Sequence, residues 1–403
     1  MAIVINGSGT VTGLAVGGLP DGTVDAGTLA TNSVDSAELI DGAVDDSHMA
    51  SIKGRKNLII NGAMRVAQRS TSVAGLGDDD EGYVTLDRMR HTTNSASAGR
   101  FTSAQTAITD LAGFANCLHL DCTTADTSIA ASEVLVLEHY IEGQDLQQFA
   151  KGTASAKDIT VSFYMKTNKA FTFMCVLNDF DNNRVNPQQF TTTTTWTRHS
   201  ITFSGDTTGT WNDDANRSLS VSIYLHAGSD HTGGTYSANT WQSRQSSNNM
   251  IAVGIGSFYD STSNDIKITG LQMEVGSTAT DFEHRSYGEE LALCQRYYFR
   301  KGEVARTCYG IGAAHTNTGL YVCVLFPVTM RASPTMYQHS DSTKCYITGS
   351  GQNQTAQSNA FGVEGANPNG ITVSITGSGL TGGNAYWFNT TNSTHWLAWD
   401  AEL

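Results

Sequence analysis

The sequence predicts a mainly β protein in which a short N-terminal stalk precedes two β-sandwiches joined by one helix. The first indication is composition: of 403 residues, 40 are Gly and only 5 are Pro, and Ser and Thr are frequent throughout the chain. This profile is typical of short strands joined by polar turns. The second is an alternation of apolar and polar residues after residue 57, which indicates half-buried strands. The third is a ten-residue repeat near the chain start, which indicates self-association.

Residues 1–20 (MAIVINGSGTVTGLAVGGLP) combine apolar residues with many glycines. This pattern suits short strands that meet a partner surface or one another. We therefore expect residues 1–20 to anchor the chain.

Residues 21–50 are three consecutive units, DGTVDAGTLA, TNSVDSAELI and DGAVDDSHMA, whose apolar residues recur every five positions. This spacing fits neither a coiled coil nor a strand. A single chain with so few apolar side chains cannot offset its ordering entropy, whereas several parallel copies could meet along an axis. We expect a stalk over residues 21–56, ending at the basic KGRK, with axial contacts from Val24, Leu29, Val34, Leu39, Val44 and Met49. The alternative is a flexible linker that happens to repeat.

Residues 57–285 carry the clearest strand signal. In ITVSFYM (159–165), Ile159, Val161 and Phe163 point one way while the polar residues between them point the other. The same pattern recurs in FTFMCVL (171–177), SITFSG (200–205), LSVSIYLH (219–226), MIAVGIGSF (250–258) and IKITGLQMEV (266–275). At least eight strands favour a two-sheet sandwich of the jelly-roll type. No helical pattern separates these strands, which disfavours a parallel α/β sheet.

Residues 286–302 predict a connector helix, with helical residues from 287 to 300. Ser286 and Glu289 have the spacing of a capping box, and Gly302 can terminate the helix. Residues 303–403 return to strand-like segments and predict a smaller β-sandwich. These segments are YVCVLFPV (321–328), KCYIT (344–348), ITVSI (371–375), AYWFN (385–389) and HWLAWDAEL (395–403).

Charge and cysteine usage exclude several classes of function. The formal net charge is −14, and no basic run is longer than Lys53–Lys56, so we expect binding neither to nucleic acid nor to an anionic membrane. The seven cysteines form no CxxC pair and indicate reduced core residues. The start of the chain does not resemble a signal peptide, and no apolar run approaches the roughly 20 residues that span a bilayer. We expect folding in the cytoplasm and no membrane insertion.

Catalytic motifs are missing from the sequence. It contains no HExxH, GxSxG or GxxxxGK[ST] motif. The acidic clusters at 78–81, 179–181 and 213–214 lie among Gly, Asn or Thr and are typical of solvated turns. We therefore expect no enzyme and no cofactor. Asp179 and Asp181 could supply oxygen ligands to a structural calcium ion, although the segment lacks a full EF-hand loop.

Ligand binding is favoured over catalysis. Sugar recognition commonly uses aromatic faces flanked by Asn, Asp or Gln, and aromatic residues in polar stretches are therefore the candidates. In the central region we single out Trp241, and in the distal region Tyr337, Tyr346 and Phe361. Each could equally pack at a sandwich edge. The most loop-like distal stretch, residues 349–370, is the preferred receptor-facing segment.

Five segments resemble the tail-fibre and related virion-fibre proteins of tailed bacteriophages, especially those of marine hosts. They are the opening 30 residues, NLIINGAMRVAQR (57–69), LQMEVGSTATDFEHRSYGEELALCQRYY (271–298), FPVTMRASPT (326–335) and the terminal DAEL. The resemblance implies a parallel homotrimer attached to the virion by its N-terminus, with a carbohydrate-binding-module-like jelly roll and a β-rich distal end facing host glycans. The sequence departs from the family pattern at position 89: an Asp-Arg-Trp phrase is expected there, but Met89 follows Asp87 and Arg88.

Three functions remain open at this stage. The first is a tail fibre that recognises a glycan receptor on the host surface. The second is the same architecture attached to the capsid as a head fibre or decoration. The third is a depolymerase that cuts surface polysaccharide. The first two cannot be separated by sequence, because residues 1–20 identify no virion partner.

Overall fold

The computed structural model describes residues 55–94, 97–244, 251–338, 345–349, 352–355, 361–377, 379–390 and 395–403, together with two short N-terminal strands. These strands, β1 (Val4–Ile5) and β2 (Val11–Thr12), pair antiparallel, as expected for strands that meet one another. The expected axial contacts Val24, Leu29, Val34, Leu39, Val44 and Met49 lie outside the described residues. The stalk and the homotrimer therefore stay predictions.

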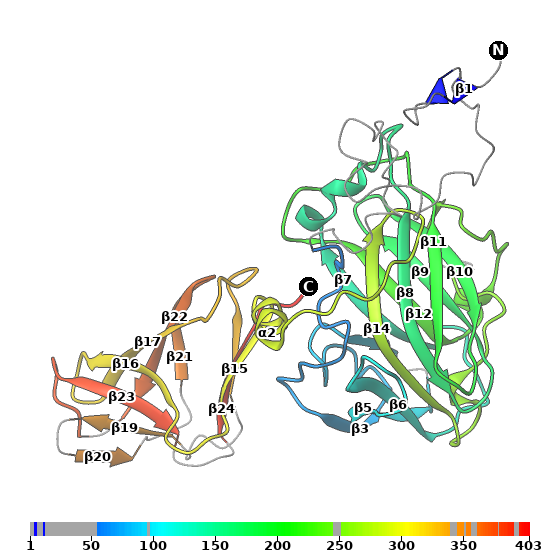
Figure 1. The fold of residues 1–403 in the computed structure, drawn as a ribbon. Coiled ribbons are helices and arrows are strands. Elements are labelled where there is room, and N and C mark those ends of the chain that lie inside the picture. Colours follow the sequence, from blue (N-terminus) through cyan, green and yellow to red (C-terminus); the bar gives the residue numbers. More distant parts are fainter. Residues whose placement is uncertain are drawn as a thin grey trace. The chain divides into compact units, whose positions relative to one another are not determined.

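Two six-stranded antiparallel sheets form the central domain (Figure 1). We name them after one strand each. The β9 sheet has the order β13 (Gln242–Ser243), β10 (Arg184–Thr191), β9 (Thr172–Asp179), β12 (Arg217–Ala227), β7 (Val134–Glu142) and β4 (Arg90–Thr93). The β8 sheet has the order β11 (Thr197–Phe203), β8 (Ile159–Thr167), β14 (Asp265–Val275), β6 (Asn116–Thr124), β5 (Arg100–Ala107) and β3 (Ser72–Leu76).

The core of the central domain lies between the β9 and β8 sheets. Phe173, Cys175 and Leu177 of β9 join the same buried cluster as Val161 and Phe163 of β8. The chain crosses between the sheets repeatedly, from β4 to β5, from β6 to β7, from β7 to β8 and from β8 to β9. The predicted two-sheet sandwich is confirmed, with the repeated crossings of a jelly roll.

A second apolar cluster covers part of the outer face of the β9 sheet. Ile251 and Ala252 pack there against Val136, Met174 and Val176. The segment MIAVGIGSF was predicted to be a strand, and this prediction is wrong: residues 251–257 form turns and irregular backbone. Its apolar residues are buried because they cover a sheet, and Gly254, at φ +71°, adopts a conformation that breaks a strand.

The connector helix α2 (Tyr287–Gln295) begins as predicted. Ser286 accepts a hydrogen bond from the Glu289 backbone N–H, and the Glu289 carboxylate accepts one from the Ser286 backbone N–H. The helix ends at Gln295, so its predicted extension to residue 300 is wrong. Residues Tyr298–Gly302 form strand β15 instead, because this segment pairs with β24 (Trp396–Asp400) and the Phe299 ring stacks on Trp399.

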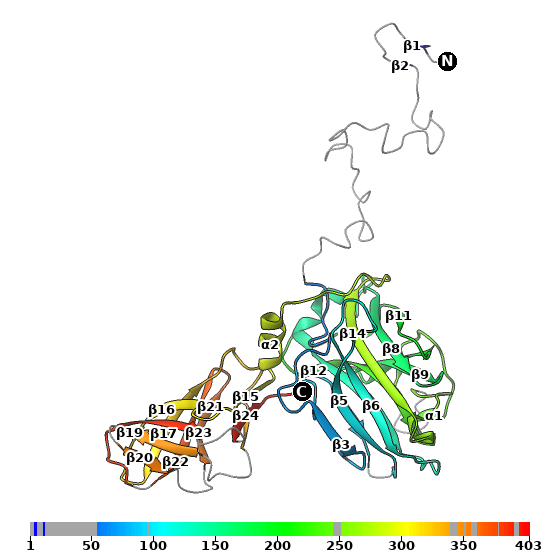
Figure 2. The same cartoon turned by 60° about the horizontal axis from the view of Figure 1, so that its bottom comes forward.

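The distal domain packs a seven-stranded sheet against a three-stranded sheet (Figure 2). The seven-stranded β17 sheet has the order β20 (Gln352–Thr355), β19 (Cys345–Gly349), β23 (Ala385–Thr390), β16 (Cys308–Ala314), β17 (Gly319–Leu325), β22 (Gly370–Thr376) and β21 (Phe361–Asn367). The β24 sheet has the order β15, β24 and β18 (Thr335–Gln338). The buried side chains of Val322 and Phe388 in the first sheet join those of Leu397 and Trp399 in the second. The smaller β-sandwich is thus present.

Two finer predictions for the distal half are wrong. The stretch 349–370 is not one long loop, because β20 and β21 lie within it. Its many glycines and polar residues are typical of loops, which is why these strands were not predicted. Cys308 and Cys323 are exposed, whereas Cys117, Cys122, Cys175 and Cys294 are buried as expected.

Three of the five segments that carry the family resemblance, 57–69, 326–335 and 400–403, meet in a buried ionic network. The side chain of Arg69 contacts Asp400 at 3.0 Å and Glu402 at 3.3 Å, and Arg88 donates to Glu402. Arg331 donates from Nε to the Ala401 carbonyl at 2.7 Å and from Nη2 to the Glu402 carbonyl at 2.9 Å. These motif residues therefore hold the C-terminal DAEL in place and are architectural.

No helix of the described residues is long and apolar enough to cross a membrane.

Candidate functional site

The four residues predicted to meet a receptor do not come together in one site. Tyr337 on β18 presents an exposed ring, with 53% of its surface accessible. Phe361 is half-buried and packs against Phe388, with ring centroids 5.3 Å apart. Trp241 is half-buried and donates its indole N–H to the Ser204 carbonyl at 2.7 Å. Tyr346 lies in β19, and its side chain is outside the described residues. Tyr337 is therefore the candidate best placed for contact.

The acidic pair proposed as calcium ligands has protein partners. Asp179 is buried, with its Oδ2 3.1 Å from Lys151 Nζ, and Asp181 Oδ2 accepts a hydrogen bond from the Asn212 backbone N–H at 2.9 Å. Within the described part of the chain, no group of three or more His, Cys, Asp or Glu side chains is arranged to hold a metal. The calcium site stays a prediction, and the Lys151 ammonium already balances the charge of Asp179.

The outer face of the β9 sheet carries a row of small polar side chains. Along β12, Leu219, Val221 and Ile223 enter the core, so that Ser218, Ser220 and Ser222 face outward. All three serines are buried. On the outer face of the β9 sheet, Ile251 and Ala252 cover the apolar residues of one half. The three serines lie in the other half, whose outward residues are polar. We call this set, with Asn178 and Glu138 on the neighbouring strands, the polar row.

Glu138 on β7 is the centre of the polar row. Its carboxylate accepts hydrogen bonds from Arg90 Nη1 at 3.0 Å, Thr92 Oγ1 at 2.5 Å, Tyr140 Oη at 3.0 Å and Ser222 Oγ at 3.1 Å. Burial and the neighbouring Glu138 raise the pKa of Tyr140 to about 12, so its hydroxyl remains a donor at neutral pH. The carboxylate is thereby fixed by donors from three strands.

Asn178 on β9 leaves one acceptor of the polar row unsatisfied. Its Nδ2 lies 3.2 Å from Ser220 Oγ and 2.9 Å from Ser222 Oγ. Its Oδ1 is buried and has no hydrogen-bond partner, and the same is true of Ser218 Oγ. A buried polar atom without a partner costs about 1–3 kcal/mol.

An aromatic and cationic rim borders the polar row. Phe180, in the turn after β9, is half-exposed, and the exposed guanidinium of Arg217 lies 3.8 Å from the centre of its ring and 4.7 Å from that of Tyr140. The Phe180 and Tyr140 rings meet edge to face at 5.8 Å. Asn and Asp residues adjoin the rim in the sequence: Asp181, Asn182 and Asn183 follow Phe180, and Asn212, Asp213, Asp214 and Asn216 precede Arg217. We call Phe180, Arg217 and Tyr140 the Phe180 rim.

The sequence analysis missed the Phe180 rim although it carried the relevant signal. Phe180 stands within Asn-Asp-Phe-Asp-Asn-Asn, which is an aromatic ring flanked by Asn and Asp, but that segment was considered only as an acidic cluster and as a calcium site. Glu138 was missed for a different reason: every residue of β7 is buried, so that strand shows no clean alternation. The alternating serines of β12 were recognised as strand but not as one polar face.

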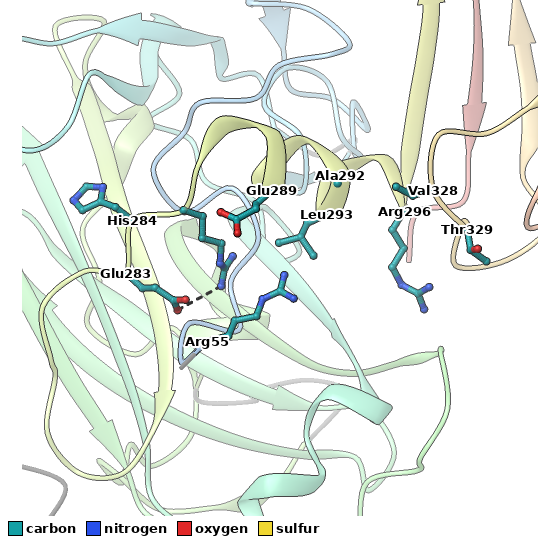
Figure 3. Close-up of a pocket in the computed structure, with 10 residues that line it drawn as sticks. Arg55, Glu283, His284, Glu289, Ala292, Leu293, Arg296, Val328 and Thr329 are labelled. Atoms are coloured by element: carbon teal, nitrogen blue, oxygen red, sulfur yellow. Dashed lines mark ion pairs between the residues drawn. The ribbon is translucent and has the colours of Figure 1, made fainter. Parts of the chain in front are cut away.

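A cavity of about 620 Å³ lies beside α2 (Figure 3). It is lined by Arg55, Arg285 and Arg296 with Glu283 and Glu289. Arg296 makes a two-point contact with Glu142, at 2.9 and 2.7 Å, which raises its pKa, and Arg285 lies 3.7 Å from Glu283. Carboxylates thus already balance two of the three cations, which makes the cavity a weak candidate for an anionic ligand.

Comparisons with known proteins give distant similarities only. No protein-family model and no curated protein matches the chain. Similar solved structures include a CBM4 structure (13% identity, 54% of this chain and 99% of that chain, TM-score 0.27). They also include the enzymatically active domain of bacteriophage CBA120 tailspike protein 4 (8% identity, 54% and 21%, TM-score 0.27). A family 11 carbohydrate-binding module of the Clostridium thermocellum cellulase Lic26A-Cel5E has 12% identity, with 53% and 98% coverage and a TM-score of 0.25. At such low similarity, none of these proteins indicates what the chain does.

Proposed function

We propose that this chain is a tail-fibre protein of a tailed bacteriophage that recognises a host surface glycan without cutting it. The recognition surface is the Phe180 rim on the outer face of the β9 sheet, next to the buried polar row. Attachment to the virion runs through residues 1–20, and the chain acts as a homotrimer.

The observation that carries the glycan assignment is the Phe180 rim, where the half-exposed Phe180 ring lies 3.8 Å from the exposed Arg217 guanidinium. Sugars present hydroxyls that donate to amide and carboxylate oxygens, and apolar ring faces that pack on aromatic side chains. The rim supplies the aromatic ring and a guanidinium donor, and Glu138 of the buried polar row holds Tyr140 of the rim in place through a hydrogen bond of 3.0 Å. The positions of these residues are fixed by sheet hydrogen bonds between β7, β12 and β9.

The fibre assignment rests on the sequence. The ten-residue repeats favour parallel copies along an axis, and five segments in order resemble virion-fibre proteins. The negative charge of −14 is compatible with an extracellular surface role and disfavours nucleic acid as the partner. Attachment to the capsid instead of the tail would leave the glycan surface unchanged.

Adsorption of the labelled full-length protein to host cells tests the glycan surface. Phe180→Ala and Arg217→Ala should each weaken adsorption about tenfold, because an aromatic or Arg contact at the centre of an interface contributes about 1–2 kcal/mol. Trp196→Ala removes a half-buried ring on the β8 side of the sandwich, and Arg100→Ala removes a guanidinium that is 29% exposed on β5. These two matched controls should leave adsorption unchanged. Equal adsorption by all four variants would exclude the Phe180 rim as the receptor contact.

A further inference from the structure

The outer face of the β17 sheet carries a contiguous apolar surface. In the sheet register, Trp387 of β23 lies directly opposite Ile311 of β16, and Ile311 lies opposite Cys323 of β17. Directly opposed residues of antiparallel strands share a face. Tyr321 and Leu325 stand two residues to either side of Cys323 and therefore share that face too. We call these five residues the distal apolar face.

The distal apolar face is open in the single chain. The exposed fractions are 79% for Leu325, 57% for Trp387 and Ile311, and 39% for Tyr321. The opposite side of the same strands is fully buried, with Val322 and Phe388 at 0%. The β17 sheet therefore has one face closed by the β24 sheet and one exposed apolar face, at whose side the His315 ring stacks on Tyr321 with ring centroids 4.2 Å apart.

Charged side chains are missing from the centre of this face. The outward positions of β23, β16, β17 and β22 in the described residues are Ala, Trp, Ile, Tyr, Cys, Leu, Thr and Ser together with Asn389. Interface centres are depleted of charge and enriched in aromatic residues. Because the chain as a whole carries −14, most other contacts between two copies would bring like charges together. An uncharged face allows copies to approach without that cost.

The size of the face suits a protein partner. The uncharged part of the face spans four strands, and a spacing of about 4.8 Å with about 3.3 Å per residue gives roughly 400 Å² of surface. A standard interface buries about 800 Å² on each partner, so this face would supply about half of one and add to the contact expected along residues 21–50. A sugar ring would cover only part of this area, and the aliphatic Ile311 and Leu325 offer it no hydrogen bonds.

We propose that the distal apolar face is an interface between copies of this chain. The proposal rests on the homotrimer of the proposed function and assigns to it a second contact surface, separate from residues 21–50. It is independent of the glycan site, which lies on the β9 sheet. Burial of Ile311, Trp387 and Leu325 between copies would remove their apolar surface from water and stabilise the assembly.

The exposed thiol of Cys323 provides the test, because it lies at the centre of the face. Full-length protein is labelled with a neutral maleimide under native conditions, and the Cys323 peptide is quantified by mass spectrometry. Cys323 should react roughly tenfold or more slowly in the parent protein than in the double variant Ile311→Glu/Leu325→Glu, since charges at the interface open it. The control Ile129→Glu/Val304→Glu changes two residues that are 45% and 65% exposed and lie outside the face; it should behave like the parent.

Three outcomes would overturn the proposal. One is equal labelling of Cys323 in the parent and in Ile311→Glu/Leu325→Glu, with circular dichroism confirming that both are folded. Another is a monomer mass for the parent by light scattering, which would also remove the homotrimer. A third is protection of Cys323 only after host polysaccharide is added, which would make the face a sugar platform. Protected Cys323 without any glycan adsorption would support this interface and refute the proposed glycan function alone.

Discussion

At the scale of single residues, buried histidines of the central domain couple folding to pH. The His91 ring is fully buried, packs edge to face on Phe101, and has its Nε2 2.9 Å from Ser103 Oγ. Burial, followed by the charge of Arg90, lowers the pKa of His91 to about 4. Burial also holds the pKa of His139 well below its usual range. His91 is therefore mostly neutral in the folded protein at pH 5, whereas in the unfolded chain it is mostly protonated.

The direction of the resulting pH dependence follows from linkage. A histidine whose folded pKa lies below its unfolded value of about 6.5 binds its proton preferentially in the unfolded state, so stability is complete above pH 6.5 and is lost as pH falls toward 4. For His91 the loss between pH 7 and pH 5 is about 2 kcal/mol. In His91→Gln, urea unfolding should show a pH 7 to pH 5 loss that is smaller by about that amount. An unchanged pH dependence would mean that His91 is not buried neutral.

Chemistry at single positions was partly predictable from the sequence. The criterion of an aromatic residue among Asn and Asp fits Phe180 but was applied to Trp241 and the distal tyrosines instead. Asn178, Glu138 and the serines of β12 could be grouped only with the sheet order, because they come from strands separated by 40 or more residues in the chain. Sequence alone gives no register between distant strands.

At the scale of elements, strands β8, β12 and β14, whose polar and apolar residues alternate, were predicted, and strand β7, which lacks that alternation, was missed. Strand β8 was predicted within a few residues, because its outward residues Thr160 and Ser162 alternate with apolar ones. Strand β7 was missed, since polar and apolar residues alike are buried along it. The helix α2 was placed correctly at its start, where capping is local, and wrongly at its end, where pairing of β15 with the distant β24 decides the structure.

The capping box of α2 gives an element-scale prediction. Ser286→Ala removes the side chain that accepts from the Glu289 backbone N–H, and we expect it to lower the free energy of unfolding by about 1 kcal/mol. Ser155→Ala, at an exposed turn position, serves as the control and should change stability by less than about 0.5 kcal/mol. Urea unfolding of the full-length protein measures both. No loss in Ser286→Ala would show that tertiary contacts alone set the start of α2.

At the scale of the whole molecule, three of the segments that resemble virion-fibre proteins have a structural role. Arg69, Arg331 and Glu402 come from these segments and meet at Glu402, whose side chain is 6% exposed and pairs with the Arg88 side chain, which is 1% exposed. Arg88 also lies over the Tyr297 ring, at 3.6 Å from its centre. These segments therefore stabilise the folded part of the chain. The proposed recognition surface lies outside them.

Breaking this buried network should be costly. Glu402→Gln keeps the shape of the side chain but leaves the Arg88 guanidinium without its charge partner, and we expect a loss of about 3 kcal/mol or more. The matched change Glu303→Gln affects a 53% exposed partner of Arg300 and should cost less than about 1 kcal/mol. Thermal unfolding of the two variants checks the difference. Equal melting temperatures would show that the network contributes nothing to stability.

The central claim is that the chain binds host glycan without cleaving it, and one measurement tests it most directly. Full-length protein is incubated with purified surface polysaccharide of the host, and reducing ends are counted alongside the amount of protein retained on the polysaccharide. The account predicts saturable retention, reduced about tenfold in Phe180→Ala, with no increase in reducing ends over time. Sustained release of reducing ends, or no retention of the unmodified protein, would contradict it.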